Sequence, residues 1–430
     1  MILAGGEIFQ SSEQNKILGT LEEKINLTLS SEKLDRETVI AAADRFGKMI
    51  SDGDFDHIIK QLSEEDFGEY VKTAAMLMKR ENIEYRIASE LGTDFKERQN
   101  VTPPYGIESA EIRFAPLGTL FHIAAGNVDG LPAFSVLEGL LTGNVNILKL
   151  PEADNGLSVE IFKQLIKIEP ALKNFIYVFD TPSSDVSAMK KMADISDGIV
   201  VWGGDSAVKA VRTLAPAGAK IIEWGHKLGF AYVSGYEDKN AELSALAHHI
   251  ISTRQLFCSS CQTIFVNTED IEALEQFCKD FLPFLEEAAA ENPISEIGVS
   301  AEITLRKYNS LLENAIGTGD SGKRIFQGNG CSLTILPDSG LELSYMYGNC
   351  LVKPLPERKI MTSLRNSKGY LQTAGLICEK ESRNRLTEIL VRSGVNRVMR
   401  AGNMSVSFCG EAHDGEYPLR RYMRVVNIEK

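Results

Sequence analysis

The chain has 430 residues, of which 43% are hydrophobic and 24% charged, enough for about two or three domains with a sizeable core. Its formal net charge of -13 argues against nucleic-acid binding, and no basic block interrupts the acidic balance. The opening residues become polar too soon for a signal peptide, and no apolar run approaches membrane-spanning length. Seven scattered cysteines indicate a reducing compartment, so we expect a cytoplasmic protein.

Residues 11 to about 100 are rich in Glu, Lys and Leu and have helical periodicity over 34–50 and 67–92. They carry no evident chemistry, and we expect them to form a layer packed over a later sheet. Pro103 and Pro104 mark a break. Residues 108–118 then alternate as an exposed strand or hairpin arm does.

From residue 118 onward, short apolar runs alternate with helical stretches. We predict strands at 118–125, 145–150, 175–179, 198–202 and 219–223, with helices at 131–142, 156–168, 184–193 and 205–214 between them. Such alternation indicates right-handed crossovers and a parallel sheet, whose ligands bind beyond the carboxyl ends of the strands. The residues at those ends are Asn127, Lys149, Gly203 and Glu223, and no Gly-x-Gly-x-x-Gly fingerprint is present.

A second α/β region follows, with helices near 269–290 and 297–314, strands near 332–336 and 350–355, and a last strand at 421–428. The stretch 249–266 carries its candidate chemistry. An amphipathic helix precedes Cys258 and an apolar run that predicts a buried strand follows it, so Cys258 lies at a junction that is rigid yet accessible. A thiolate attacks carbonyl carbon readily, which makes Cys258 a candidate nucleophile; the alternative is a small buried hydrophobe.

Cys258 and Cys261 form a Cys-x-x-Cys pair, which is also compatible with half of a zinc site or with a redox pair. A zinc site needs further ligands, and the sequence offers no second close Cys/His pair. We therefore expect no metal site and keep the redox pair as an alternative.

Four segments in the same order resemble the aldehyde dehydrogenase superfamily. GNVDGLP at 126–132 and ILKLPE at 147–152 are similar to its Asn after the first strand and its Lys-Pro-x-Glu type segment. Gly203 and Gly204 before a helix resemble its phosphate-side turn, and EWGHKLGFAYV at 223–233 resembles its Glu-Leu-Gly-Gly-Lys segment. Gln255 followed by Cys258 resembles its Gly-Gln-x-Cys segment.

One branch of the superfamily is more similar still. HIAAGNVDGLP, WGHK, a Gln before CSS and the C-terminal HDGEYPLRRYMRVVN resemble the LuxC-type acyl-CoA (acyl-protein thioester) reductases, from about residue 105 to the end. The chain has one extra residue between Gln255 and Cys258, His226 in place of the usual glycine, and no clear Glu-x-x-Phe-Gly-Pro segment. These departures argue against an oxidative, hydrolytic activity.

The resemblance implies an oxidoreductase that reduces an acyl thioester, of fatty acyl type, to an aldehyde through an acyl-enzyme on Cys258. The Asn127 amide and the Cys258 backbone N–H would stabilise the oxyanion, although Asn127 also suits an ordinary turn. Glu223 would relay protons, with a solvated or salt-bridged carboxylate as the alternative. His226 and His413 are either proton shuttles or structural hydrogen bonders.

The resemblance also implies a nicotinamide cofactor, NADPH or NADH. Lys149 and Glu152 would meet the adenosine ribose hydroxyls, and the alternative is a surface ion pair at a strand end. Gly203 and Gly204 would let the pyrophosphate approach a helix N-terminus, unless they form an ordinary strand-to-helix turn.

The fold implied is aldehyde dehydrogenase-like: a Rossmann-like cofactor domain with the N-terminal helices (1–103 and 117–229), an α/β catalytic domain (230–415) and a small β oligomerisation arm (104–116 and 416–430). We expect a homodimer or homotetramer, and acyl-CoA or an acyl-carrying or acyl-transferring protein as donor. The competing functions are oxidation of an aldehyde to an acid or acyl-CoA, a cysteine acyltransferase or hydrolase without nicotinamide, and a non-catalytic scaffold.

Overall fold

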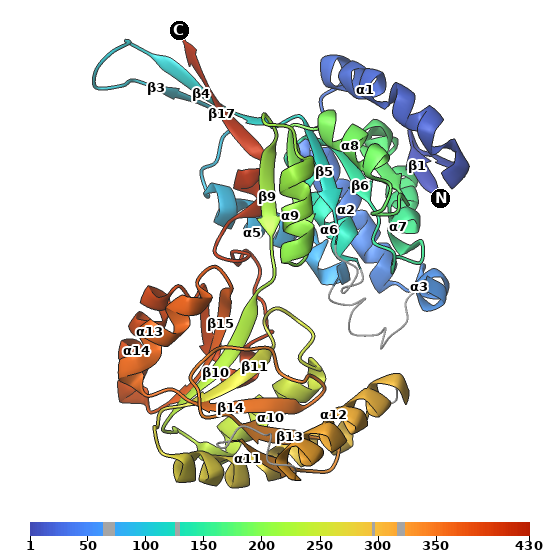
Figure 1. The fold of residues 1–430 in the computed structure, drawn as a ribbon. Coiled ribbons are helices and arrows are strands. Elements are labelled where there is room, and N and C mark those ends of the chain that lie inside the picture. The colour runs from blue at the N-terminus through green and yellow to red at the C-terminus, as the bar shows by residue number, and fades with distance from the viewer. Residues whose placement is uncertain (63–73, 125–129, 295–296, 316–322) are drawn as a thin grey trace. The chain divides into compact units, whose positions relative to one another are not determined.

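The computed structural model describes residues 1–62, 74–124, 130–294, 297–315 and 323–430 (Figure 1). The chain forms two compact units: unit 1 is Met1–Gly225 with Phe408–Lys430, and unit 2 is His226–Ser407. Each unit is built on its own seven-stranded sheet. Among the described residues, none of the helices combines the length and apolar character needed to cross a membrane.

The sheet of unit 1 has the order β2-β1-β7-β6-β5-β8-β9. Its strands are β1 (Ile2–Ala4), β2 (Glu7–Phe9), β5 (Thr119–Ile123), β6 (Val145–Lys149), β7 (Ile176–Phe179), β8 (Gly198–Trp202) and β9 (Lys220–Trp224). The five strands β7-β6-β5-β8-β9 are parallel, and β1 joins β7 antiparallel. The predicted parallel sheet is confirmed, whereas the β1–β2 hairpin was not predicted, because two three-residue strands leave almost no periodicity to detect.

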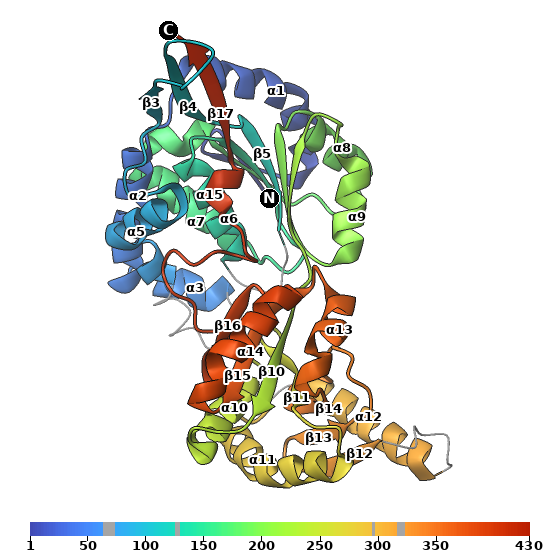
Figure 2. The ribbon, with the colours of Figure 1, turned by 90° about the vertical axis from the view of Figure 1, so that its left-hand side faces the viewer.

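Helices cover this sheet in two groups (Figure 2). The helices α6 (Leu131–Leu141) and α7 (Leu157–Ile168) follow β5 and β6, while α8 (Val186–Asp194) and α9 (Asp205–Leu214) follow β7 and β8. The N-terminal helices are α1 (Gln14–Ser31), α2 (Arg36–Ser51), α3 (Asp56–Leu62) and α5 (Arg80–Leu91). Because α2 packs against α6 and α7, and α1 against α8, these helices form the expected covering layer.

A small antiparallel sheet extends from unit 1, with the order β17-β4-β3 (Figure 1). Its strands are β3 (Arg98–Val101), β4 (Ala110–Pro116) and β17 (Met423–Glu429). The register pairs Met423 with Pro116 and Glu429 with Ala110. The two arm strands predicted near 108–118 and 421–428 are therefore present and adjacent, and β3 adds a strand that was not predicted.

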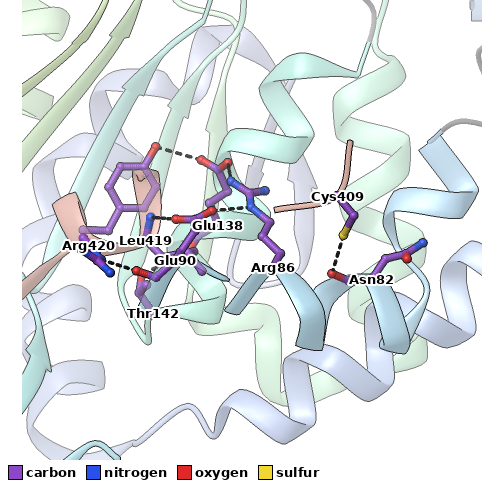
Figure 3. A network of polar contacts seen from close by, with 9 residues as sticks. Asn82, Arg86, Glu90, Glu138, Thr142, Cys409, Leu419 and Arg420 are labelled. Carbon is purple, nitrogen blue, oxygen red and sulfur yellow. Dashed lines mark hydrogen bonds and ion pairs between the residues drawn. The ribbon is translucent and has the colours of Figure 1, made fainter. Parts of the chain in front are cut away.

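The C-terminal segment of unit 1 is tied to α5 and α6 by a buried polar network (Figure 3). The Arg86 guanidinium lies between the carboxylates of Glu90 and Glu138, at 2.6 Å from Glu90 Oε1. The Leu419 backbone N–H donates to Glu90 Oε2 at 2.8 Å, and the Tyr422 hydroxyl donates to Glu138 Oε2 at 3.1 Å. These bonds join three segments that are far apart in sequence: α5, α6 and the C-terminal segment of the chain.

Unit 2 has the sheet order β12-β13-β14-β11-β10-β15-β16, parallel except for β12. Its strands are β10 (Leu228–Ser234), β11 (Cys261–Val266), β12 (Arg324–Gln327), β13 (Ser332–Ile335), β14 (Asn349–Pro354), β15 (Leu371–Cys378) and β16 (Arg397–Arg400). Its helices are α10 (Lys239–Ser252), α11 (Ile271–Glu291), α12 (Ile297–Ala315), α13 (Ile360–Leu364) and α14 (Lys380–Ser393). One core joins the sheet to α10 and α11, and a second joins it to α13 and α14.

Candidate active site

Cys258 lies in the short turn that joins α10 to β11, as the sequence predicted, and its side chain is exposed. The Phe257 N–H donates to Ser260 Oγ at 3.1 Å, and the Ser260 N–H donates to the Phe257 carbonyl at 3.0 Å. These two bonds close the turn around Cys258 and Ser259. The thiol is therefore held by a tight, bonded loop and stays open to solvent.

The other cysteines differ from Cys258 in accessibility. Cys261 begins β11 and is 1% exposed, and burial raises the pKa of its thiol to about 12. Cys278, Cys331, Cys350 and Cys378 are also buried, and Cys409 is half-buried. None of the seven is in a disulfide, and no group of three His, Cys, Asp or Glu side chains among the described residues could hold a metal ion. Cys258 is thus the one of the seven cysteines that is exposed.

Gly229 on β10 makes room for the cysteine turn, which is the segment 253–260 between α10 and β11. A Cβ atom at this position would lie 2.5 Å from the Ser260 carbonyl oxygen and 2.9 Å from that of Ser259. Real Cβ atoms do not approach backbone oxygen so closely, so the turn can rest on β10 only because this residue is glycine. Gly229 lies within the segment quoted above for its family resemblance, but its contact with the turn was not foreseen.

Both neighbours of β10 change register at Gly229. On β11, Gly229 pairs with Cys261 but Phe230 pairs with Thr263, which leaves Gln262 as an extra residue. On β15, Leu228 pairs with Leu371 but Phe230 pairs with Ala374, which leaves one extra residue between them. Bulges of this kind re-aim side chains and are frequent beside active sites.

Two buried glutamines occupy these irregular positions. Gln262 donates from Nε2 to the Gln255 carbonyl at 2.7 Å, and its Oε1 accepts from the Ser344 hydroxyl at 2.9 Å. Gln372 donates from Nε2 to Cys258 Sγ at 3.3 Å. Sequence reasoning missed both residues. A glutamine inside an otherwise apolar strand, as in CQTIFV and LQTAGLIC, is the signal that could have found them.

Gln255 anchors the beginning of the same turn from inside. Arg254 and Gln255 have φ of 50° and 60°, in the left-handed region that residues other than glycine rarely adopt. The Gln255 side chain is fully buried; its Nε2 donates to the Cys261 carbonyl at 2.8 Å, and its Oε1 accepts from the Gly348 N–H at 3.1 Å. These bonds hold the strained backbone, so Gln255 fixes where the cysteine turn starts.

The second candidate region is the carboxyl edge of the sheet in unit 1. From β5 the chain adds β6 and β7 on one side of the sheet and then β8 and β9 on the other side. Ligands of such sheets bind at this switch point, between β5 and β8. Lys149 ends β6 and is buried; its Nζ donates to Ser183 Oγ at 2.9 Å. Burial lowers the pKa of Lys149, although nearby Glu152, which is exposed, opposes that shift.

Gly203 and Gly204 lie between β8 and α9, where they were predicted to be. Gly204 is the residue that caps the N-terminus of α9, and a Cβ there would meet no atom within 4 Å. A Cβ on Gly203 would lie 3.0 Å from Ala207 Cβ. The space beside Gly204 and the helix N-terminus together suit an approaching phosphate group.

Glu223 lies near the end of β9 and is held by Arg212 of α9. Arg212 donates from Nε to Glu223 Oε1 at 2.5 Å and from Nη2 to Oε2 at 2.7 Å. Both carboxylate oxygens are therefore engaged, which corresponds to the salt-bridged alternative for this residue. A proton relay through Glu223 first requires this ion pair to open.

The remaining candidates are placed as follows. Asn127 falls within residues 125–129, outside the described residues. His226 is exposed, with its ring centroid 6.3 Å from that of Tyr370. His413 packs against both tryptophans of the chain, with ring centroids 5.0 Å from Trp202 and 5.0 Å from Trp224.

The two sheets and the cysteine turn define an aldehyde dehydrogenase fold. The NADP-dependent glyceraldehyde-3-phosphate dehydrogenase of Bacillus halodurans, solved with NADP, superposes with a TM-score of 0.70 at 14% identity, covering 99% of this chain and 98% of that one. At this low identity the likeness concerns the fold. It confirms the fold that the sequence resemblance implied.

Within this fold the chain belongs to the family described as acyl-CoA reductase (LuxC), whose profile matches residues 31–425. The long-chain acyl-protein thioester reductase 2 of Photobacterium leiognathi is 26% identical over 337 residues, which cover 74% of this chain and 66% of that protein. The long-chain acyl-protein thioester reductase of Aliivibrio fischeri is 24% identical over 331 residues, covering 74% and 65%. The chain thus spans just under two thirds of the length of these curated relatives.

Proposed function

We propose that this protein reduces an acyl thioester to an aldehyde with a nicotinamide cofactor, through an acyl group carried on Cys258. The observation that carries the proposal is the exposed Cys258 thiol in a rigid turn, in a chain that belongs to the acyl-CoA reductase (LuxC) family. The Cys258 thiolate attacks the acyl carbon, and the donor thiol leaves. When the acyl carbon has been reduced, the thiohemiacetal collapses to aldehyde and releases Cys258.

Exposed apolar side chains that precede Cys258 in sequence, or that lie on a segment bonded to Gln262, support a fatty acyl group as substrate. Leu256 and Phe257, which directly precede the cysteine, are 42% and 37% exposed. Leu343 and Tyr345 are exposed on the segment that Ser344 ties to Gln262. Exposed apolar groups beside a nucleophile favour a hydrophobic substrate. The family description suggests acyl-CoA as donor, and the names of the relatives suggest an acyl-protein thioester, which we take to be an acyl-carrier or acyl-transferring protein.

Oxyanion stabilisation is assigned to Asn127 and to the backbone N–H of Cys258. Each tetrahedral step places negative charge on the former carbonyl oxygen, and a lost donor typically costs about 100- to 1000-fold in rate. In the sequence Asn127 follows the last residue of β5, Ile123, by four positions, and this order is what supports the proposal. An Asn127→Ala variant that kept its rate within about threefold would remove this assignment.

The cofactor, NADPH or NADH, supplies the hydride that reduces the acyl carbon. Lys149 and Glu152 are the residues proposed for the adenosine ribose, and Gly203 and Gly204 for the pyrophosphate. The open space at Gly204 and the buried Lys149 at the end of β6 support this placement.

Oxidation of an aldehyde is the second candidate, and it requires a base that activates water. The Arg212–Glu223 ion pair engages the carboxylate that would serve as this base, which favours thioester reduction. The proposal includes a homodimer or homotetramer assembled through the arm sheet, since β3 and β17 are its outer strands among the described residues.

The test is a panel of acyl-CoAs of increasing chain length with NADPH or NADH, monitored by loss of nicotinamide absorbance and by aldehyde formation. We expect oxidation that depends on the acyl donor and disappears in Cys258→Ser. Cys409→Ser, which changes a half-buried cysteine bonded to the Asn82 carbonyl, serves as the matched control and should keep activity. Aldehyde oxidation without acyl-CoA reduction would favour the second candidate instead.

A further inference from the structure

The structure assigns a catalytic role to Gln372: its side-chain amide donates a hydrogen bond to Cys258 Sγ and thereby stabilises the thiolate that attacks the acyl donor and is released again with the aldehyde. The two atoms, Gln372 Nε2 and Cys258 Sγ, are 3.3 Å apart. The inference deepens the proposed function and rests on it for the identity of the reaction. The contact between Gln372 and Cys258 is observed whichever reaction the site performs.

The position of Gln372 follows from the sheet. Leu371 begins β15 and pairs with Leu228, while Ala374 pairs with Phe230, so Gln372 and Thr373 together oppose Gly229. The irregular register turns the Gln372 side chain to the end of the sheet where the cysteine turn lies, and the missing side chain of Gly229 lets that turn approach.

Contacts of its side chain and of its backbone position Gln372. Its Oε1 accepts from the Thr373 hydroxyl at 3.4 Å, and its backbone carbonyl accepts from the Asn396 N–H at 3.2 Å. The residue is 6% exposed, so its side chain has little freedom. With the oxygen engaged by Thr373, the NH2 group is the end that faces sulfur. A thiolate accepts this bond better than a thiol or a thioester does, so the contact favours the charged form.

A neutral amide suits a thiolate that must form twice in each cycle. It donates without accepting the thiol proton, so it stabilises Cys258 both before attack and when the thiohemiacetal expels sulfur. The step balances from the thiohemiacetal alkoxide, whose hydroxyl proton has passed to solvent: the C=O bond of the aldehyde forms, the C–S bond breaks, its electron pair stays on Cys258, and the Gln372 N–H remains in place.

Other ionisable residues on the neighbouring elements of unit 2 could contribute to a pH profile. Burial lowers the pKa of His249 on α10 to about 4, and burial raises that of Cys261 on β11 to about 12. Arg397 on β16 donates to the Met404 and Val406 carbonyls. His226, beside Tyr370 before β15, is exposed. The alkylation rate of Cys258 is therefore measured over the whole pH range, with His226→Gln identifying any part due to that imidazole.

The test is the rate of iodoacetamide alkylation of Cys258 as a function of pH, measured on the full chain by peptide mass. Gln372→Met keeps the side-chain length and removes the donor, while Gln372→Glu replaces the donor with an acceptor. We expect the midpoint to rise by about one pH unit in Gln372→Met, which is about tenfold less thiolate at neutral pH, and further in Gln372→Glu. Circular dichroism and thermal unfolding establish that each variant is folded.

Gln262→Met is the matched control, since it removes the other buried glutamine of the same edge, which bonds to Gln255 and Ser344 rather than to sulfur. Its midpoint should equal that of the wild-type protein. Equal midpoints in all variants, or the same rise in Gln262→Met, would overturn the role of Gln372. Alkylation needs neither acyl donor nor cofactor, so a shifted midpoint in a protein that reduces neither acyl-CoA nor acyl-protein thioesters would uphold this contact while refuting the proposed function.

Discussion

Gly229 and Ser260 lie so close that the cysteine turn packs directly against the backbone of β10. Any side chain at Gly229 would place its Cβ 2.5 Å from the Ser260 carbonyl oxygen, and backbone oxygen cannot move aside cheaply. The turn that carries Cys258 therefore depends on a residue that is distant in sequence and has no chemistry of its own.

The first prediction follows from this contact. Gly229→Ala should displace the turn, lower the free energy of unfolding by about 1–3 kcal/mol as overpacking does, and slow alkylation of Cys258. Denaturant unfolding and peptide mass measure the two effects. Gly298→Ala on α12, where a Cβ meets no atom within 4 Å, is the control and should leave both values unchanged or slightly raise stability. Equal behaviour of the two variants would show that the contact is not limiting.

The second prediction concerns Glu223. Because Arg212 engages both of its carboxylate oxygens, Glu223→Gln should change the rate of acyl-thioester reduction by less than about fivefold. Arg212→Gln should have an equally small effect. Steady-state kinetics decide between the alternatives, since a loss of about 100-fold in Glu223→Gln alone would restore its role as proton relay.

The third prediction concerns the buried network in Figure 3. Arg86→Met removes the cation between Glu90 and Glu138 and should lower the free energy of unfolding by about 3–5 kcal/mol, because it leaves buried carboxylates uncompensated. Burial raises the pKa of Glu138, whereas Arg86 acts to lower it.

That pKa shift fixes the sign of the pH dependence. A carboxyl group whose pKa is raised by folding stabilises the fold below its unfolded pKa, and this contribution is lost as the pH rises through the folded pKa. The loss of unfolding free energy in Arg86→Met should thus be smallest at acid pH, below the ordinary Glu pKa of 4.5, and should grow toward neutral pH. Arg80→Met on the same helix breaks exposed pairs with Glu37 and Glu84 and should show little of this dependence. A deficit independent of pH would contradict the electrostatic account.

The fourth prediction concerns cofactor choice. Glu152 is exposed near the end of β6, and a carboxylate there repels a 2′-phosphate. Glu152→Gln should therefore lower the KM for NADPH relative to that for NADH by about threefold to tenfold. Lys149→Met should raise the KM for both cofactors. An unchanged ratio of the two KM values in Glu152→Gln would place the ribose elsewhere.

Local pattern was sufficient to predict much of unit 1. The strand Gly198–Trp202 and the helix Asp205–Leu214 occur with the predicted bounds, because a buried apolar run and an amphipathic stretch are each visible within a few residues. The same holds for Cys258, whose junction was evident from the flanking helix and strand.

Contacts between distant segments could not be predicted from the sequence. The bond from Gln372 to Cys258 depends on a register irregularity between β10 and β15, and the Arg212–Glu223 pair depends on how α9 packs beside β9. Neither relation leaves a periodic trace in a single sequence, because register is set by packing across strands. The proposed roles of Asn127, Lys149, Glu152, Gly203 and Gly204 remain predictions for experiment.

The most direct test of the central claim is a single-turnover measurement of the intact mass of the protein. Mixed with a long-chain acyl-CoA and no cofactor, the wild-type protein should gain one acyl group, located by peptide mass at Cys258, and Cys258→Ser should gain none. Adding NADPH or NADH should then discharge the acyl group as aldehyde. An acyl group that lies on another residue or that leaves as free acid would contradict reduction through a Cys258 acyl-enzyme, and so would an acyl group that is absent both with acyl-CoA and with an acyl-protein donor.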